Sequence, residues 1–261
     1  MRTPWIAVIA AAFIGGAGAV LLADPGTTEP RVLVTPAAAS SSAHAGHTAI
    51  NGQAITGVKA GDIAAETQPD QPLSAEDRDT LAAQLTEARA VGLRYPTTTD
   101  ALEAGYILAG GFAPGSGAHY VLTNGSGFVS STGIDIEHPG SLIYEGTNPD
   151  SKLVGLMYLG GGADAPEGFV GPNDHWHRHS AVCIRYGPNG IEVPFPADSD
   201  VTLKQCQEVH GQFMTITTWM VHAWVVPGWE SPLGVFSHDN PNIRCGDGTY
   251  DTNKSGFCDG I

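Results

Sequence analysis

The sequence is poor in basic residues and in charged residues generally. Lysine and arginine together number 12 among 261 residues, against 27 aspartates and glutamates, so the formal net charge is −15. A surface of that sign repels phosphate backbones, which excludes nucleic acid as an expected partner. With 34 glycines, 18 prolines and 15% charged residues, the composition is typical of a turn-rich β protein rather than a helical bundle.

The chain also lacks the short motifs that identify common enzyme classes. It contains no Gly-x-Ser-x-Gly, no His-Glu-x-x-His and no phosphate-binding loop. A general base would have to be one of several scattered carboxylates, namely Glu167, Asp174, Glu192 and Asp239. Nothing in the sequence ranks these four, so whether the protein is an enzyme stays open.

No Cys-x-x-Cys pair occurs, although four cysteines lie in the last third of the chain. Outside the cytoplasm an even number of cysteines is typical of disulfides. Of the three ways to pair them, we favour the one between sequence neighbours, which joins Cys183 to Cys206 and Cys245 to Cys258. The alternative is that the thiolates bind a metal.

The first 23 residues are predicted to target the membrane. Trp5 to Leu22 carry no charged or strongly polar side chain, and Arg2 precedes them on the cytoplasmic side. The run is longer than the usual apolar core of a signal peptide, about 7–15 residues, and shorter than the roughly 20 of a spanning helix. Residues 1–23 are therefore either a cleaved signal peptide or a retained membrane anchor, and the domain lies outside the cytoplasm.

Two regions follow this leader. Residues 24–71 are rich in Ala, Ser, Thr, Gly and Pro without a periodic apolar pattern, which predicts a flexible tether. Residues 72–261 are predicted to form a single β-rich metal-binding domain whose C-terminal tail is clamped by a disulfide.

The domain is predicted to begin with helices. Ser74 opens a Ser-Ala-Glu-Asp sequence typical of a capped N-terminus, and Gly92 ends the helix. Its apolar positions at helical spacing are Leu81, Leu85, Ala88 and Val91. A second, short helix is predicted from Thr98 or Thr99 to Gly105.

After Tyr106 the pattern changes to short apolar runs between turn residues, which predicts strands. The predicted strands are His119–Leu122, Gly127–Ser130, Ser141–Tyr144, Lys152–Tyr158, His175–Tyr186 and Phe213–Val226. Strands in series without helices between them indicate an α+β, mainly β fold. We expect an antiparallel β-sandwich or barrel preceded by one or two N-terminal helices.

The most informative segment is Asp-His-Trp-His-Arg-His, which ends at His179. On a strand, alternate side chains share a face, so His175, His177 and His179 lie together. Neighbours two apart are roughly 6.5–7 Å from each other, close enough for two imidazoles to bind one ion. The outer pair is too far apart for this, so His177 and His179 are the favoured ligands. The alternative is a solvated histidine face.

Further ligands must come from other strands. His222 shares a strand face with Met220 and Trp224, where a buried imidazole needs a polar partner. His119 and His238 are the other candidates, and a hydrogen-bonded structural histidine is the alternative for each. Imidazole ligands suit zinc or copper best here, with iron as a third metal.

The chain resembles a group of uncharacterised bacterial secreted proteins over residues 73–242. The shared landmarks are Ala104-Gly-Tyr106, His119-Tyr-Val121, Leu142-Ile-Tyr-Glu145, Trp176-His-x-His179 with Cys183, His222-Ala-Trp-Val, Pro232-x-Gly-x-Phe236 and Asn240-Pro241. The group has no established activity. The resemblance implies that His119, His177, His179 and His222 belong to one functional pattern.

A weaker resemblance is to cupins, whose small β-barrels hold a metal between two motifs. His177-Arg-His179 stands for the first motif, and Pro232-x-Gly234 with His238 and Asn242 stands for the second. The first motif lacks its glutamate, and the second is one residue too long before His238. This resemblance implies a metal-dependent oxygenase or hydrolase.

Taken together, the sequence predicts an extracytoplasmic domain that binds a transition-metal ion through histidines. Its expected role is to bind a metal or another ligand. A cupin-like metal-dependent enzyme is the second hypothesis. A structural, disulfide-stabilised surface domain without metal is the third. The expected partners are the metal ion and, if the leader is retained, the membrane.

Overall fold

The structure is a computed structural model that describes residues 70–123, 132–195, 201–248 and 258. The leader 1–23, nearly all of the tether 24–71 and the predicted strand Gly127–Ser130 lie outside these residues. Within the described residues, none of the helices combines the length and hydropathy that crossing a membrane requires.

Three helices are described: α2 (Ala75–Gly92), α3 (Thr98–Glu103) and α4 (Leu203–Glu208). The hydroxyl of Ser74 accepts a hydrogen bond from the Asp77 backbone at 3.0 Å, so the predicted cap of α2 is confirmed. The helix α4 was not predicted from the sequence. Thr202 and Gln205 cap each other reciprocally at its start, a Thr-x-x-Gln signal that was available.

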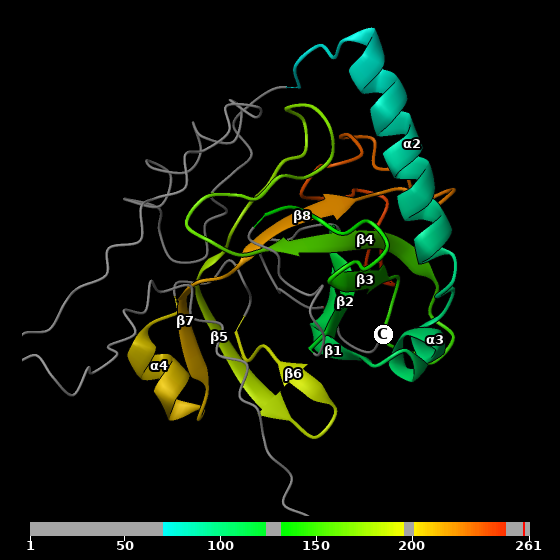
Figure 1. The fold of residues 1–261 in the computed structure, drawn as a ribbon. Helices are drawn as coiled ribbons and strands as arrows, with labels where there is room; N and C mark the ends of the chain where they lie inside the picture. The colour runs from blue at the N-terminus through cyan, green and yellow to red at the C-terminus, as the bar shows by residue number, and fades with distance from the viewer. Residues whose placement is uncertain (1–69, 124–131, 196–200, 249–257, 259–261) are drawn as a thin grey trace, which may run out of the picture.

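The strands form one curled sheet in the order β7-β5-β6-β1-β2-β3-β4-β8 (Figure 1). Their bounds are β1 (Tyr106–Ala113), β2 (Gly117–Leu122), β3 (Ser141–Tyr144), β4 (Leu153–Gly160), β5 (Ser180–Gly187), β6 (Gly190–Glu192), β7 (Gln212–Ile216) and β8 (Trp219–Ala223). Every pairing is antiparallel except that of β1 with β6. The predicted α+β, mainly β class is confirmed.

The largest differences from the predicted strands lie in three regions. The region His175–Tyr186 becomes a continuous strand only at Ser180, and Phe213–Val226 divides into β7 and β8. Strand β1 was missed because Gly110-Gly111 interrupts its apolar pattern. Gly110 adopts φ 82°, where the β1–β2 register also shifts, so glycine is required at this irregular point.

The two ends of the sheet are joined beside the histidine run. Strands β7 and β8 stand at opposite ends of the strand order, yet they are separated in sequence by only Thr217 and Thr218. His177, which precedes β5, forms an isolated antiparallel bridge with Met220 of β8. The residues before β5 therefore contact β8 and, through His179 and Thr217, the connection between the two end strands.

The main core lies where α2 and the C-terminal segment pack on the sheet. Trp176, Trp219 and Trp224 are its largest buried side chains, and α2 contacts β4. Gly155 is required beneath Trp224, because an added Cβ would lie 2.6 Å from the indole ring. The two disulfides pair sequence neighbours, as favoured: Cys183 with Cys206, and Cys245 with Cys258.

Candidate metal centre

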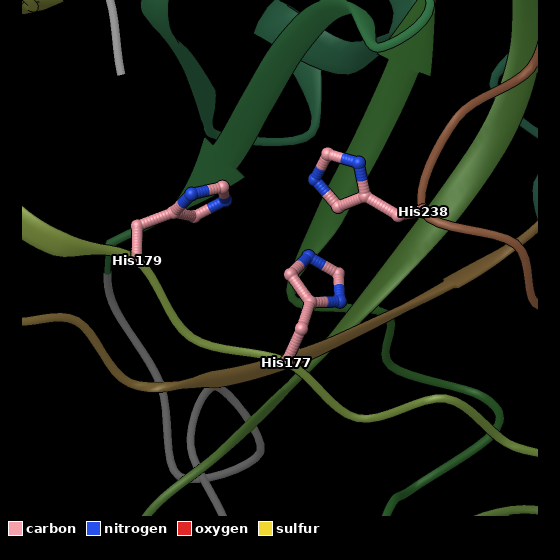
Figure 2. A group of neighbouring side chains, drawn as sticks. All are labelled: His177, His179 and His238. Carbon is pink, nitrogen blue, oxygen red and sulfur yellow. The ribbon is translucent and has the colours of Figure 1, made fainter. Parts of the chain in front are cut away.

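Three histidines from two separate segments meet inside the curled sheet. His177 and His179 lie just before β5, while His238 lies in the segment after β8. One nitrogen of each ring lies within 4.8 Å of the corresponding nitrogens of the other two. Figure 2 shows the three rings turned toward a common space. This is the convergence that a shared metal ion requires.

Backbone pairing positions the first two rings. The His177 amide donates to Met220 O, and the Met220 amide donates to His177 O, both at 2.9 Å. The His179 amide donates to the Thr217 hydroxyl at 2.9 Å, and the Thr217 amide donates back to His179 O at 2.8 Å. The alternation of a strand is thus preserved from His177 to His179, although the regular strand begins only after them.

A residue with a strained backbone lies shortly after His179. Ala181 adopts φ 54°, the left-handed region that costs a non-glycine residue roughly 1–2 kcal/mol. Backbone strain of this kind persists where the surrounding structure over-determines it, and it clusters at functional sites. Here it lies two residues after His179.

The segment that carries His238 is held by hydrogen bonds to its backbone. Trp224 Nε1 donates to Ser237 O at 2.7 Å, and the Ser237 hydroxyl donates to Asp239 O at 2.7 Å. His238 Nδ1 lies 2.8 Å from Asp239 Oδ1. When Nδ1 donates to that carboxylate, Nε2 presents its lone pair, which is the usual arrangement of a metal-binding histidine.

His222 borders the same space from β8. Its ring centroid lies 5.1 Å from that of His177 and 5.5 Å from that of His238. His222 Nδ1 donates to His238 O at 2.7 Å, so Nε2 carries the lone pair. His222 therefore borders the group of three with an Nε2 that is unpartnered among the described residues, but it is not one of the histidines whose nitrogens all lie within 4.8 Å of one another.

His119 lies beside His222, outside the group of three. Its ring lies 5.5 Å from that of His222, and its Nε2 donates to Ser116 O at 3.2 Å. That bond fixes the tautomer and leaves Nδ1 as the acceptor. His119 thus adjoins the cluster without belonging to the group of three.

Several imidazole nitrogens in this cluster are buried without a hydrogen-bond partner among the described residues. They are His177 Nε2, His179 Nδ1 and His222 Nε2. Leaving one such group unsatisfied costs about 1–3 kcal/mol. A metal ion would supply the missing partner to each nitrogen.

Burial keeps these rings neutral. Desolvation, followed by repulsion from His238, lowers the pKa of His179 to about 3 and those of His177 and His222 well below 6.5. Desolvation also lowers the pKa of His119 to about 4. Neutral imidazole is the form that binds metals, so the site is prepared for an ion at neutral pH.

The metal-free protein is expected to lose stability as the pH falls from about 6.5 toward 4, because the unfolded chain then binds more protons than the folded one. Each of the four histidines with lowered pKa lowers the free energy of unfolding by about 1.4 kcal/mol per pH unit within its window. Denaturant titrations at about pH 7 and pH 5 measure this. In His119→Gln, the pH dependence of the free energy of unfolding should fall by the contribution of one histidine. A free energy of unfolding that does not change with pH would contradict the expectation.

The remaining sequence candidates lie apart from the cluster. His175 Nε2 bonds to Asp70 Oδ1 at 2.8 Å. His177 and His179 therefore come together without His175. Among the carboxylates, Glu192 pairs with Arg185, and Asp174 accepts from Trp176 Nε1. Asn242, part of the cupin resemblance, donates to Glu230 O on the surface.

Two supporting residues had no ligand role in the sequence prediction. The sequence analysis named Asp239 only as one of four candidate general bases. Its position directly after His238 is the signal that could have identified it as a partner of that histidine. Thr217 holds His179 across 38 positions of sequence. No local pattern could have identified it, because that contact depends on the pairing of β5 with β7.

Comparison with known proteins found no match to a family model, to a curated protein or to a solved structure.

Proposed function

We propose that this protein binds one transition-metal ion outside the cytoplasm, with His177, His179 and His238 as ligands and the unpartnered Nε2 of His222 beside the remaining coordination position. The observation that carries the proposal is the convergence of three buried imidazoles, with one nitrogen of each within 4.8 Å of the others. A structural role for the histidines would leave buried nitrogens of His177 and His179 without partners among the described residues. Metal binding satisfies them.

The donor set favours particular metals. Three or four imidazoles suit zinc and copper, with iron as the third choice, whereas calcium and magnesium prefer oxygen ligands. Their buried position also favours ions that bind tightly to neutral nitrogen. Zinc or copper is therefore the proposed occupant.

Elemental analysis of the full-length chain, purified from an oxidising compartment without a polyhistidine tag, tests the proposal. We expect about one equivalent of zinc or copper per chain, as in a mononuclear site. Extended X-ray absorption then counts the imidazole donors as three or four. A folded protein that neither contains nor takes up stoichiometric metal would rule the function out.

Asp239→Asn is expected to weaken metal binding by about 10–100-fold, because Asp239 orients His238 and increases its basicity. The affinity is measured by competition with a chelator of known strength. The chain offers a matched control in Asp135→Asn, since Asp135 bonds to the exposed His138 at the same 2.8 Å. Equal affinities in the two variants would show that Asp239 has no positioning role.

A second candidate function is metal-dependent catalysis of the cupin kind. What favours it is that His177, His179 and His238, which the cupin resemblance assigns to two distant motifs, lie together in the structure. An exchangeable water on the bound metal, detected by the relaxation of solvent protons in a copper-loaded sample, would support an oxygenase or hydrolase. A coordinatively closed ion would support storage or transfer of the metal.

The proposed location follows from the cysteines and the leader. Both disulfides are of the kind that forms and persists in an oxidising compartment. The apolar run from Trp5 to Leu22 would direct export. In that compartment the tether would hold the metal-binding domain near the membrane if the leader is retained.

A further inference from the structure

The proposed metal centre would carry a positive charge that its ligands do not cancel. Imidazoles are neutral donors, so a divalent ion on His177, His179 and His238 keeps both of its charges. The nearby carboxylate of Asp239 contributes one negative charge, through His238. Charge buried in a protein is stabilised by pairing, so the ion has an affinity for one further anion.

An apolar cluster lies beside the same site. On β2, His119 and Val121 are two residues apart and therefore share a face of the sheet. Their partners on β1 are Ala109 and Ile107. Val121 packs in a cluster with Ile184 and Ile191 that also includes Ile107, Ala109, Val182, Val193 and Met214.

This cluster, hereafter the apolar cluster, differs from the main core in its exposure. Ile107, Ala109, Val182 and Met214 are only partly buried, although β1 and β5, which carry the first three, have a neighbouring strand on each side. Val182 and Met214 face each other across β5 and β7. Partly exposed apolar side chains thus continue from the histidine cluster along one face of the curled sheet.

We propose that the bound metal ion takes a small organic carboxylate as an exogenous ligand, whose apolar body packs against the apolar cluster. The inference rests on the proposed metal centre and names the class of molecule that the centre selects. The carboxylate supplies the missing negative charge. The hydrocarbon part covers partly exposed apolar surface, which adds affinity in proportion to the area removed from water.

Cobalt-loaded full-length protein provides the test, because the visible absorption of Co²⁺ responds to its ligands. The probes are acetate, hexanoate and the uncharged analogue hexanamide. We expect acetate and hexanoate to shift the cobalt bands, with hexanoate binding at least about tenfold more tightly because of its four extra methylene groups. Hexanamide, which has the same length without the charge, is expected to leave the bands unchanged.

A matched pair of variants locates the apolar contact. Met214→Gln should weaken hexanoate binding severalfold and leave acetate binding unchanged, whereas Met214→Leu should preserve both. Because the ratio of hexanoate to acetate affinity is measured within each folded protein, a general loss of stability does not imitate this result.

The outcomes separate the two proposals. If the wild-type chain fails to bind cobalt, zinc or copper, the metal centre and the carboxylate ligand both fail. If cobalt binds and no carboxylate shifts its bands, a group of the chain already completes the coordination and only the carboxylate proposal fails. Equal affinities for acetate and hexanoate would likewise refute the role of the apolar cluster.

Discussion

Replacing both His177 and His179 by alanine is expected to abolish stoichiometric metal binding, from about one ion per chain to less than about a tenth. The two imidazoles supply two of the three closest donors, and His238 with His222 cannot complete a tetrahedral shell without them. Elemental analysis after dialysis against a weak chelator measures the loss.

The control for this variant is His138→Ala. The exposed His138 side chain bonds to the neighbouring Asp135, so its removal tests whether the loss of any histidine lowers the metal content. Because His177 is fully buried, His179→Ala alone provides a second variant with a smaller effect on folding. Full metal content in the folded double variant would contradict the assignment of these ligands.

Metal binding is expected to raise the free energy of unfolding by about 4 kcal/mol when the free ion is at a thousand times its dissociation constant. For a domain of this size that corresponds to a rise in melting temperature on the order of 10 °C. The physical reason is that the ion binds only where His177, His179 and His238 are held together, which the unfolded chain does not do. Scanning calorimetry with and without a chelator measures the shift.

The same measurement on the double variant His177→Ala/His179→Ala serves as the control. Its melting temperature should be insensitive to added metal, apart from weak binding elsewhere. A rise equal to that of the wild-type protein would show that the stabilising ion binds at another site, such as the histidines of the segment before residue 70.

The three proposed ligands are also tied to strands at the two ends of the sheet. His177 bridges to β8, His179 bonds to the residue after β7, and His238 is tied to His222 of β8. An ion bound to these rings would connect the residues before β5 with the segment after β8. On the proposed function, metal binding would therefore be coupled to the closing of the curled sheet.

Local patterns predicted much of the secondary structure. The cap at Ser74, the helical spacing that follows it and the strand Ser141–Tyr144 depend on neighbours a few residues apart, and the structure has all of them. The predictions failed where tertiary pairing decides. Strand β1 tolerates Gly110-Gly111 because β2 and β6 flank it, and the parallel pairing of β1 with β6 has no local signal.

By itself, the sequence predicted the mainly β class and favoured, among three possible pairings, the disulfides between sequence neighbours that the structure has. It also favoured His177 and His179, because the two-residue repeat of a strand places alternate side chains on one face whatever the rest of the chain does. Only the tertiary structure decided that His238 joins them, that His175 turns away to Asp70, and that Asp239 and Thr217 support the site. Those contacts join residues from different strands and loops, and their distances are set by the curl of the sheet.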